Sequence, residues 1–431
     1  AISMANAIGH RGPDGSGDFL ADVEQANGSV AFSHARLSII DLDGSHQPIH
    51  SDHGCVLMVN GEIYNHKKIK STLRDYPFRT AGDSEVIMAL HRKYSWNQPV
   101  GKNPAERHIE WVSKLDGMWG FSLWDPKAKE LILCRDPFGI KPLVRTQLSD
   151  GTLLFGSEVK TFRGHPDFTA KPDISALSVR LAYEYPLDQT TLFQGVTSVG
   201  IGTIETWSLA EGKATLTGVA KYWKPRLIPS ENWSPSTNAS QLLNSLRDSI
   251  QDRLMADVPV GIVLSGGLDS SLMAALAHDT ADSAGKPTPE CWTVADSEEN
   301  VDLQASITVT KNHDLGHHVH IMDENTMWKK LPEFVWNGED LDITVMFWQS
   351  VFEQMKGNVT VALCGQGADE LHAGYSRYRA LTEHSNVVKS RLSLAGQISI
   401  SENDRGLGKP WSSDSICLLY TSPSPRDVEE S

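Results

Sequence analysis

Short apolar or alternating runs dominate the first half of the chain and predict β-strands. These runs, separated by LDG, DHG and SDG turns, cover residues 30–40, 56–59, 119–124, 131–134 and 153–155. A helix is expected over residues 83–94, because Val86, Ile87 and Leu90 recur on one face. Thr80 and Asp83 resemble a capping box at its start. We therefore expect a β-rich α+β domain that ends near residue 207.

The second half alternates short apolar strands with helical patterns. Strands are expected at VPVGIVL, CWTVA and VTVALC, and helices over 241–255, from 271, from 302 and over 341–355. Strands that alternate with helices predict a parallel doubly wound sheet. A segment rich in Pro, Ser and Asn precedes this region, so we interpret residues 208–240 as a linker between domains over 1–207 and 241–385.

Both ends of the sequence suggest a fragment of a longer protein. The chain starts at Ala1, within a helical pattern and without an initiator methionine. From Cys417 the tail reads CLLYTSPSPRDVEES, which resembles a translated cloning adapter and has no periodicity. We expect truncation at both ends and exclude residues 386–431 from fold prediction.

Composition narrows the class of protein. The net charge of −15 argues against a nucleic-acid coat or an anionic-membrane binder, both of which need basic patches. The sequence contains no run of eighteen apolar residues, so no membrane-spanning helix is expected. The 5 cysteines are scattered without a CxxC pair, so neither a disulfide scaffold nor a zinc site is indicated. A cytoplasmic protein fits best.

The strongest local signal is LSGGLDSS at residues 264–271, between a predicted strand and helix. Gly266 and Gly267 lack a Cβ, so their amides can approach a ligand closely, and the next helix offers unpaired N–H groups. Asp269 would repel phosphate by itself but suits a Mg²⁺ ion beside pyrophosphate. The alternative is a purely structural role, as a Gly-rich turn with Asp as a helix cap. No GK[ST] follows, so this is not a Walker A loop.

A second loop, CGQGADE at residues 364–370, also follows an apolar strand. Ligands of open α/β sheets bind beyond the carboxyl ends of the strands, so we expect both loops at one crevice. Asp369 and Glu370 would bring acidic groups there, and Asp369 is a second candidate Mg²⁺ ligand. A solvated turn is the alternative. HHVH at 317–320 alternates like a strand, which we favour over a metal site.

Several long motifs in one order resemble the asparagine synthetase family of glutamine amidotransferases. The motifs are HRGPDGSG, HARLSIIDL, NGEIYN, GDSE, LDGMWGFSLWD, RDPFGIKPL, GSEVK, LSGGLDSS and GQGADELHAGY, and they cover roughly residues 1–380. The resemblance implies an α+β N-terminal-nucleophile (Ntn) glutaminase sandwich, followed by an α/β parallel-sheet ATP pyrophosphatase domain. The implied reaction adenylates the aspartate side chain with ATP and amidates it with ammonia from glutamine.

The resemblance also implies the glutamine site. In this family the Asn side chain and Gly N–H of the NGE motif, here Asn60 and Gly61, form the oxyanion hole. A free amino acid needs a cation for its carboxylate and an anion for its ammonium. The matching glutamine-binding positions are Arg36, Leu37, Asn60, Gly61, Glu62 and Asp83. Taken singly, Arg36 could instead form a surface ion pair, Asn-Gly a hairpin turn and Asp83 an N-cap.

For the nucleotide, the resemblance implies ATP with Mg²⁺ as cofactors. The matching ATP-binding positions are Leu264, Ser265, Gly266, Gly267, Asp269, Ser270, Val294, Cys364 and Gly365. Glutamine and aspartate are the implied partners, neither nucleic acid nor membrane is expected, and a homodimer stays open. Residues 337–348 differ from the family's aspartate-binding pattern, which leaves another carboxylate acceptor open.

One departure concerns the nucleophile. The family uses a cysteine at the mature N-terminus, whereas this chain has Ala1 there and no cysteine before Cys55. Cys55 itself falls in an apparent strand, which favours a buried core thiol. We expect the chain as given not to hydrolyse glutamine, and we favour truncation over loss of the nucleophile. β-Lactam synthetases have the same fold and lack that cysteine. The alternative to an asparagine synthetase is therefore an enzyme of that kind, a related amidotransferase with another acceptor, or a non-catalytic homologue.

Overall fold

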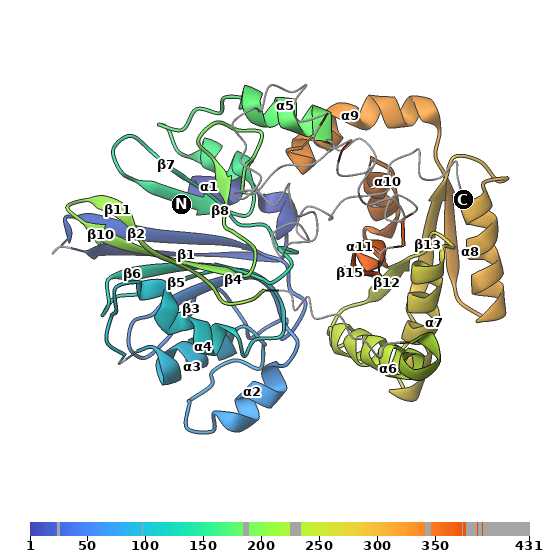
Figure 1. Ribbon diagram of the computed structural model, residues 1–431, viewed down its shortest axis with the longest axis horizontal. Helices are drawn as coiled ribbons and strands as arrows, with labels where there is room; N and C mark the ends of the chain where they lie inside the picture. The colour runs from blue at the N-terminus through green and yellow to red at the C-terminus, as the bar shows by residue number, and fades with distance from the viewer. Residues whose placement is uncertain are drawn as a thin grey trace. The chain divides into compact units, whose positions relative to one another are not determined.

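The computed structural model divides the chain into two compact units, residues 1–226 and a second unit that begins at residue 227 (Figure 1). It describes residues 1–375 except 24–25, 97, 184–188, 225–233, 341–345 and 373, together with residues 386 and 390. Most of the doubtful tail and part of the acceptor region therefore lie outside the described residues. No helix of the described part is long and apolar enough to cross a membrane.

A six-stranded antiparallel sheet organises the first unit. Its strand order is β11-β10-β6-β5-β4-β3. The strands are β3 (Ile49–His50), β4 (Val56–Ile63), β5 (Gly117–Asp125), β6 (Glu130–Arg135), β10 (Thr203–Ala210) and β11 (Lys213–Lys221). The central strands β5 and β6 are buried along nearly their whole length, because layers cover both faces of the sheet.

Smaller sheets and short helices complete the first unit. One sheet pairs β1 (Gly15–Val23) with β2 (Gly28–Arg36), and the other joins β7 (Val144–Gln147), β8 (Leu153–Gly156) and β9 (Thr197–Ser198). The α-helices are α1 (Ile2–Asn6), α2 (His66–Thr72), α3 (Glu85–Tyr94), α4 (Ile109–Val112) and α5 (Ile174–Tyr183). The 3₁₀ turns span Gly9–Arg11, Pro104–His108 and Val159–Gly164.

Two hydrophobic cores hold these layers together. One lies on the face of the six-stranded sheet that α2, α3 and α4 cover, and includes Trp111, Trp119 and Phe121. The other joins the opposite face to β1, β2 and β8, through Phe32 and Trp124. The unit is therefore a sandwich of helices, a large sheet and smaller sheets, as expected for an α+β glutaminase-type fold.

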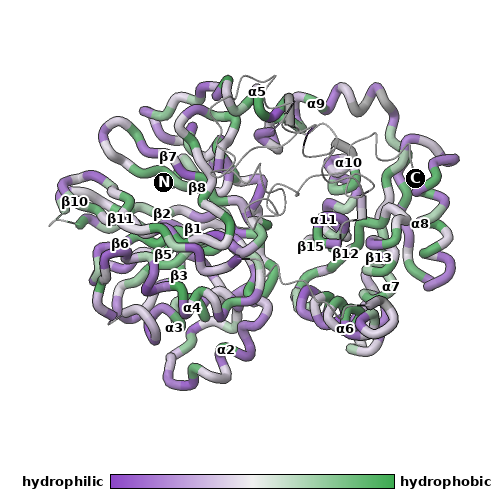
Figure 2. The backbone as a smooth tube through the Cα atoms, viewed as in Figure 1, coloured by the Kyte–Doolittle hydropathy of each residue, from purple (hydrophilic) through white to green (hydrophobic). Residues whose placement is uncertain are grey.

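A four-stranded parallel sheet forms the centre of the second unit, in the order β14-β13-β12-β15. The strands are β12 (Val260–Val263), β13 (Glu290–Ala295), β14 (His317–Ile321) and β15 (Val361–Leu363). The helices are α6 (Pro235–Arg253), α7 (Leu268–Ser283), α8 (Val301–Asn312), α9 (Glu324–Gly338), α10 (Met346–Met355) and α11 (Ala368–His372). Figure 2 shows hydrophobic colour along the interior strand β12. The expected α/β parallel-sheet class is confirmed.

The sequence predictions and the structure differ at several places, three of which concern a helix cap, a domain end and a helix start. Ser84 is the N-cap of α3 and makes no side-chain cap bond, so the expected capping box is wrong. The Glu85 carboxylate instead accepts hydrogen bonds from the amides of Arg79 and Thr80. Hairpin β10–β11 runs across the expected domain end at 207, and β11 occupies part of the expected linker 208–240. Helix α7 begins at Leu268, earlier than the expected start at 271.

Phe121 tests how much the helix-covered core contributes to stability. Its side chain is fully buried in β5, so we expect Phe121→Ala to lower the free energy of unfolding by about 3–5 kcal/mol. Leu20→Ala, at a side chain 69% exposed, is the control and should change it by less than about 0.5 kcal/mol. Urea denaturation followed by circular dichroism measures both. Equal effects of the two substitutions would contradict this core assignment.

Candidate active sites

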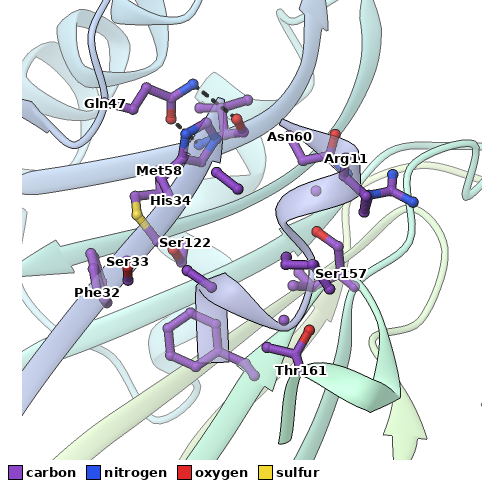
Figure 3. Close-up of a pocket in the computed structure, with 18 of the residues that line it drawn as sticks. Arg11, Phe32, Ser33, His34, Gln47, Met58, Asn60, Ser122, Ser157 and Thr161 are labelled. Atoms are coloured by element: carbon purple, nitrogen blue, oxygen red, sulfur yellow. Dashed lines mark hydrogen bonds between the residues drawn. The ribbon is translucent and has the colours of Figure 1, made fainter. Parts of the chain in front are cut away.

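A cavity of about 560 Å³ opens within the first unit. All six positions expected to bind glutamine line it, namely Arg36, Leu37, Asn60, Gly61, Glu62 and Asp83. Helix α1 contributes part of the wall through Met4 and Ala5. Figure 3 shows His34 and Asn60 among the side chains around the cavity, with Arg11 and Ser157 nearby. The sequence motifs therefore converge on one concave site.

Strand β4 presents the NGE residues to the cavity. Asn60 and Gly61 lie within this strand, paired with Gly120 and Trp119 of β5, so the alternative of a hairpin turn is wrong. A Cβ at Gly61 would lie 2.1 Å from the backbone oxygen of Met118. Only glycine lets β4 and β5 approach this closely while Asn60 still faces the cavity.

Arg36 is held by the loop that follows its own strand. Its side chain is buried, and its Nη1 and Nη2 donate to the backbone oxygens of Leu42 (2.8 Å) and Asp41 (2.9 Å). The alternative of a surface ion pair is therefore wrong. Asp41 also accepts hydrogen bonds from the amides of Ala81 and Gly82, which ties this loop to the GDSE segment. Arg36 and Asp83 are thus fixed by one network.

Asp83 connects the start of α3 to the NGE strand. Its Oδ2 accepts a hydrogen bond of 2.5 Å from the amide of Ile63, the last residue of β4. The carboxylate therefore does not cap α3, and the N-cap alternative is wrong. Burial raises the pKa of Asp83. The interaction places Asp83 beside Glu62 on the cavity wall.

Acidic and basic groups share this cavity. Burial, and secondly the negative charge of Asp83, raise the pKa of Glu62 to about 8, while Lys141 opposes the change. Burial also lowers the pKa of Lys141 and, to about 4, that of His34. Lys141 belongs to the RDPFGIKPL motif, but neither spacing nor periodicity showed that it would face Glu62. Sequence reasoning therefore missed this cation and His34.

Several buried polar atoms of the cavity lack a partner within the described residues. They are His34 Nδ1, Asn60 Nδ2 and Glu62 Oε2. Buried polar atoms are usually hydrogen-bonded, and leaving one without a partner costs about 1–3 kcal/mol. A donor on Asn60 and an acceptor on Glu62 therefore suit a small polar ligand.

The LSGGLDSS loop joins β12 to α7 in the second unit. Gly266 has φ +84°, and a Cβ there would lie 2.5 Å from the backbone oxygen of Asp302 in α8. Ser265 Oγ and Ser270 Oγ lie 3.0 Å apart, which closes the loop. Because α7 begins at Leu268, Asp269 and Ser270 belong to its first turn, where helix N–H groups have no intrahelical acceptors.

The second Gly-rich loop lies against the first. Strand β15 pairs with β12 in parallel, so both loops leave the carboxyl edge of the sheet. A Cβ at Gly365 would lie 3.1 Å from the amide nitrogen of Ser270. Val294 lies in β13, which pairs with β12 on the side opposite to β15. Asp369 is in α11, and a Cβ at Gly374 would lie 1.9 Å from its Oδ1. The two loops that carry most of the predicted nucleotide positions therefore lie together at the carboxyl ends of the parallel strands.

Comparisons with known proteins show which families the two parts of the chain resemble. The glutamine amidotransferase domain family matches residues 1–223, and the asparagine synthase family matches residues 241–421. Asparagine synthetase (glutamine-hydrolysing) 1 of Bacillus subtilis is 31% identical over 87% of this chain and 56% of its own length. Its namesake in Saccharomyces cerevisiae is 30% identical, covering 87% and 63%. Amidase chry2 of Gibberella zeae is 30% identical, covering 86% and 55%. The chain thus spans little more than half of these relatives.

Glu62 gives a pH-dependent test of the cavity. Its pKa rises from 4.5 to about 8 on folding, so the folded chain holds a proton that the unfolded chain releases within this window. Stability is therefore lost as pH rises from about 4.5 to 8. We expect Glu62→Gln to raise the unfolding free energy at pH 8 by on the order of a few kcal/mol, with the gain vanishing towards pH 4.5. Thermal unfolding across this range measures it.

The control for this pH test is Glu110→Gln, which also removes one carboxylate from the first unit. The Glu110 side chain is 67% exposed, so its substitution should leave the pH profile unchanged. A Glu62→Gln profile parallel to that of the wild type would show that Glu62 ionises normally in the folded chain.

Proposed function

The chain belongs to the glutamine amidotransferase domain family, with an asparagine synthase region after it, and on this basis we propose that the cavity of the first unit binds L-glutamine. The single observation that carries the proposal is a pair of buried atoms in this cavity, Asn60 Nδ2 and Glu62 Oε2, which have no hydrogen-bond partner in the part of the chain that the structure describes. One is a donor and the other an acceptor, as the two ends of glutamine require.

Each end of glutamine has a complementary group in this proposal. Arg36 attracts the α-carboxylate, with the guanidinium donors that the carbonyls of Leu42 and Asp41 do not use. Glu62 and Asp83 bind the α-ammonium. Asn60 Nδ2 and the Gly61 amide face the side-chain carbonyl, where an oxyanion develops during amide hydrolysis. The positive charge of Lys141 lowers the pKa of Glu62 and so favours its ionised form in the buried cavity wall.

In the second unit we assign the two adjoining loops to the pyrophosphate of ATP. Amides of the first loop and of the first turn of α7 suit an anion. Mg²⁺ would be held by Asp269 and, from the second loop, by Asp369, because hard cations prefer carboxylate oxygens. The ion would neutralise the phosphate charge that Asp269 would otherwise repel.

The reaction that we propose for the whole protein is glutamine-dependent synthesis of asparagine, in which water hydrolyses glutamine with the help of an N-terminal cysteine that residues 1–431 do not include. The aspartate side-chain carboxylate attacks the α-phosphorus of ATP, and pyrophosphate leaves. Ammonia from glutamine then displaces AMP, which yields asparagine and glutamate. Two of the relatives described above are named as asparagine synthetases, which favours aspartate as the acceptor over a ring-closing reaction.

Calorimetric titration of the chain with L-glutamine tests the first site. The titration is done at about pH 8.5, where Glu62, with a pKa of about 8, is mostly ionised. We expect Glu62→Gln to weaken binding about 10- to 100-fold, because one charge-assisted hydrogen bond to the ammonium is lost. The same variant should be more stable than the wild type at pH 8, so weaker binding would not reflect misfolding. Glu110→Gln should bind like the wild type. Equal affinity of both variants, or no glutamine binding by the wild type, would overturn the assignment.

Titration with ATP and Mg²⁺ tests the second site separately. Asp269→Asn should reduce the affinity for Mg²⁺-ATP roughly tenfold or more, because it removes a charged ligand of the ion. The matched control is Asp279→Asn, on the same helix α7 at a side chain 61% exposed, which should bind normally. If both variants bind Mg²⁺-ATP equally well, Asp269 is not a ligand of the ion.

A further inference from the structure

Three potential metal ligands converge inside the first unit, away from the cavity lining. Cys55 directly precedes β4, His91 belongs to α3 and Asp125 ends β5. One ligand atom from each lies within 4.8 Å of the other two. Their exposed fractions are 2%, 0% and 2%, so bulk water hardly reaches the cluster. No role in glutamine or ATP binding accounts for this arrangement.

His91 is the anomalous member of the cluster. Neither of its ring nitrogens has a hydrogen-bond partner among the described residues, although the side chain is completely buried. Its Nε2 lies 3.5 Å from Oδ2 of Asp125, too far for a good hydrogen bond. Burying an imidazole in this state is costly, and a bound cation that accepts the nitrogen lone pair would remove the cost.

Asp125 is already oriented for a ligand at this point. Its Oδ1 accepts hydrogen bonds from the amides of Lys127 (2.9 Å) and Ala128 (3.0 Å), which fixes the carboxylate group. The other oxygen, Oδ2, faces His91. Metal-binding carboxylates are typically held by such outer hydrogen bonds. Asp125 therefore has the geometry of a pre-oriented ligand.

Charge balance favours a divalent cation. A thiolate of Cys55 and the carboxylate of Asp125 carry two negative charges, and a neutral His91 adds none, so a dication would leave the buried cluster neutral. Arg107 acts electrostatically on Asp125, but its guanidinium pairs with Glu130 at 2.6 Å, so the charge of Asp125 is not balanced by a direct ion pair with Arg107. His108 also faces Glu130, at 2.9 Å.

We propose that Cys55, His91 and Asp125 bind a zinc ion that fastens β4, α3 and β5 together. Thiolate, imidazole and carboxylate are all ordinary zinc ligands, and a water molecule would complete a tetrahedral site. His91 Nε2 and Asp125 Oδ2 are already 3.5 Å apart, and the thiol sulfur of Cys55, within 4.8 Å of the other ligand atoms, needs to approach them by up to about 1 Å. Zinc binding would release the thiol proton of Cys55 to solvent and leave a thiolate ligand. The site would stabilise β4, which carries Asn60, and α3, which follows Asp83.

Cobalt substitution of the purified full chain tests the proposal. After removal of metals with a chelator, Co²⁺ should give a thiolate-to-cobalt charge-transfer band and tetrahedral d–d bands, which zinc then abolishes. Zinc should also raise the thermal unfolding midpoint of the wild type. Cys55→Ala should lose the charge-transfer band and the zinc-induced rise.

Cys134→Ala is the matched control, because Cys134 is equally buried in the same hydrophobic core. This variant should keep both responses to metal. Absence of the band in the wild type would overturn the proposal without needing any variant to fold. Its persistence in Cys55→Ala would also overturn it, because another cysteine would then bind the metal. Glutamine titration reports on the cavity separately, so the two proposals fail independently.

Discussion

The hydrogen bond from the Ile63 amide to Asp83 is the constraint on which the candidate glutamine site depends. It joins the end of β4, which carries Asn60 and Glu62, to the segment that leads into α3. Asp41 fastens the same segment to the loop that holds Arg36. A ligand-binding residue supplied by a loop is thereby fixed against a rigid sheet, which reduces the cost of ordering it on binding. The NGE strand, the GDSE segment and the loop after Arg36 thus form one connected wall of the cavity.

The sheet itself makes that wall possible. Gly61 lets β4 approach β5 closely, and β5 is buried on both faces, so the NGE segment has little freedom to move. The wall also carries ionisable side chains that are largely shielded from water. Glu62, Asp83 and Lys141 all have pKa values shifted by burial. Clusters of perturbed groups in a concave site are characteristic of functional sites.

Much of the fold could be predicted, because buried strands and amphipathic helices leave strong patterns. The central strands and the Gly-rich loop before α7 follow directly from apolar runs and turn residues. Strands β1 and β11 were missed, because their sequences, GSGDFLADV and KATLTGVAK, are rich in small or polar residues and alternate only weakly in hydropathy. Helix α9 was missed because Pro332 interrupts its pattern. The electrostatic influence of Lys141 on Glu62 arises only in the folded structure, so no local sequence pattern records it.

The most direct test of the central claim is a crystal structure of the chain with L-glutamine. The account predicts the α-ammonium between Glu62 and Asp83, the α-carboxylate towards Arg36 and the side-chain carbonyl at Asn60 Nδ2. Glutamine bound in the reverse orientation, or an empty cavity at a saturating concentration of glutamine, would contradict it.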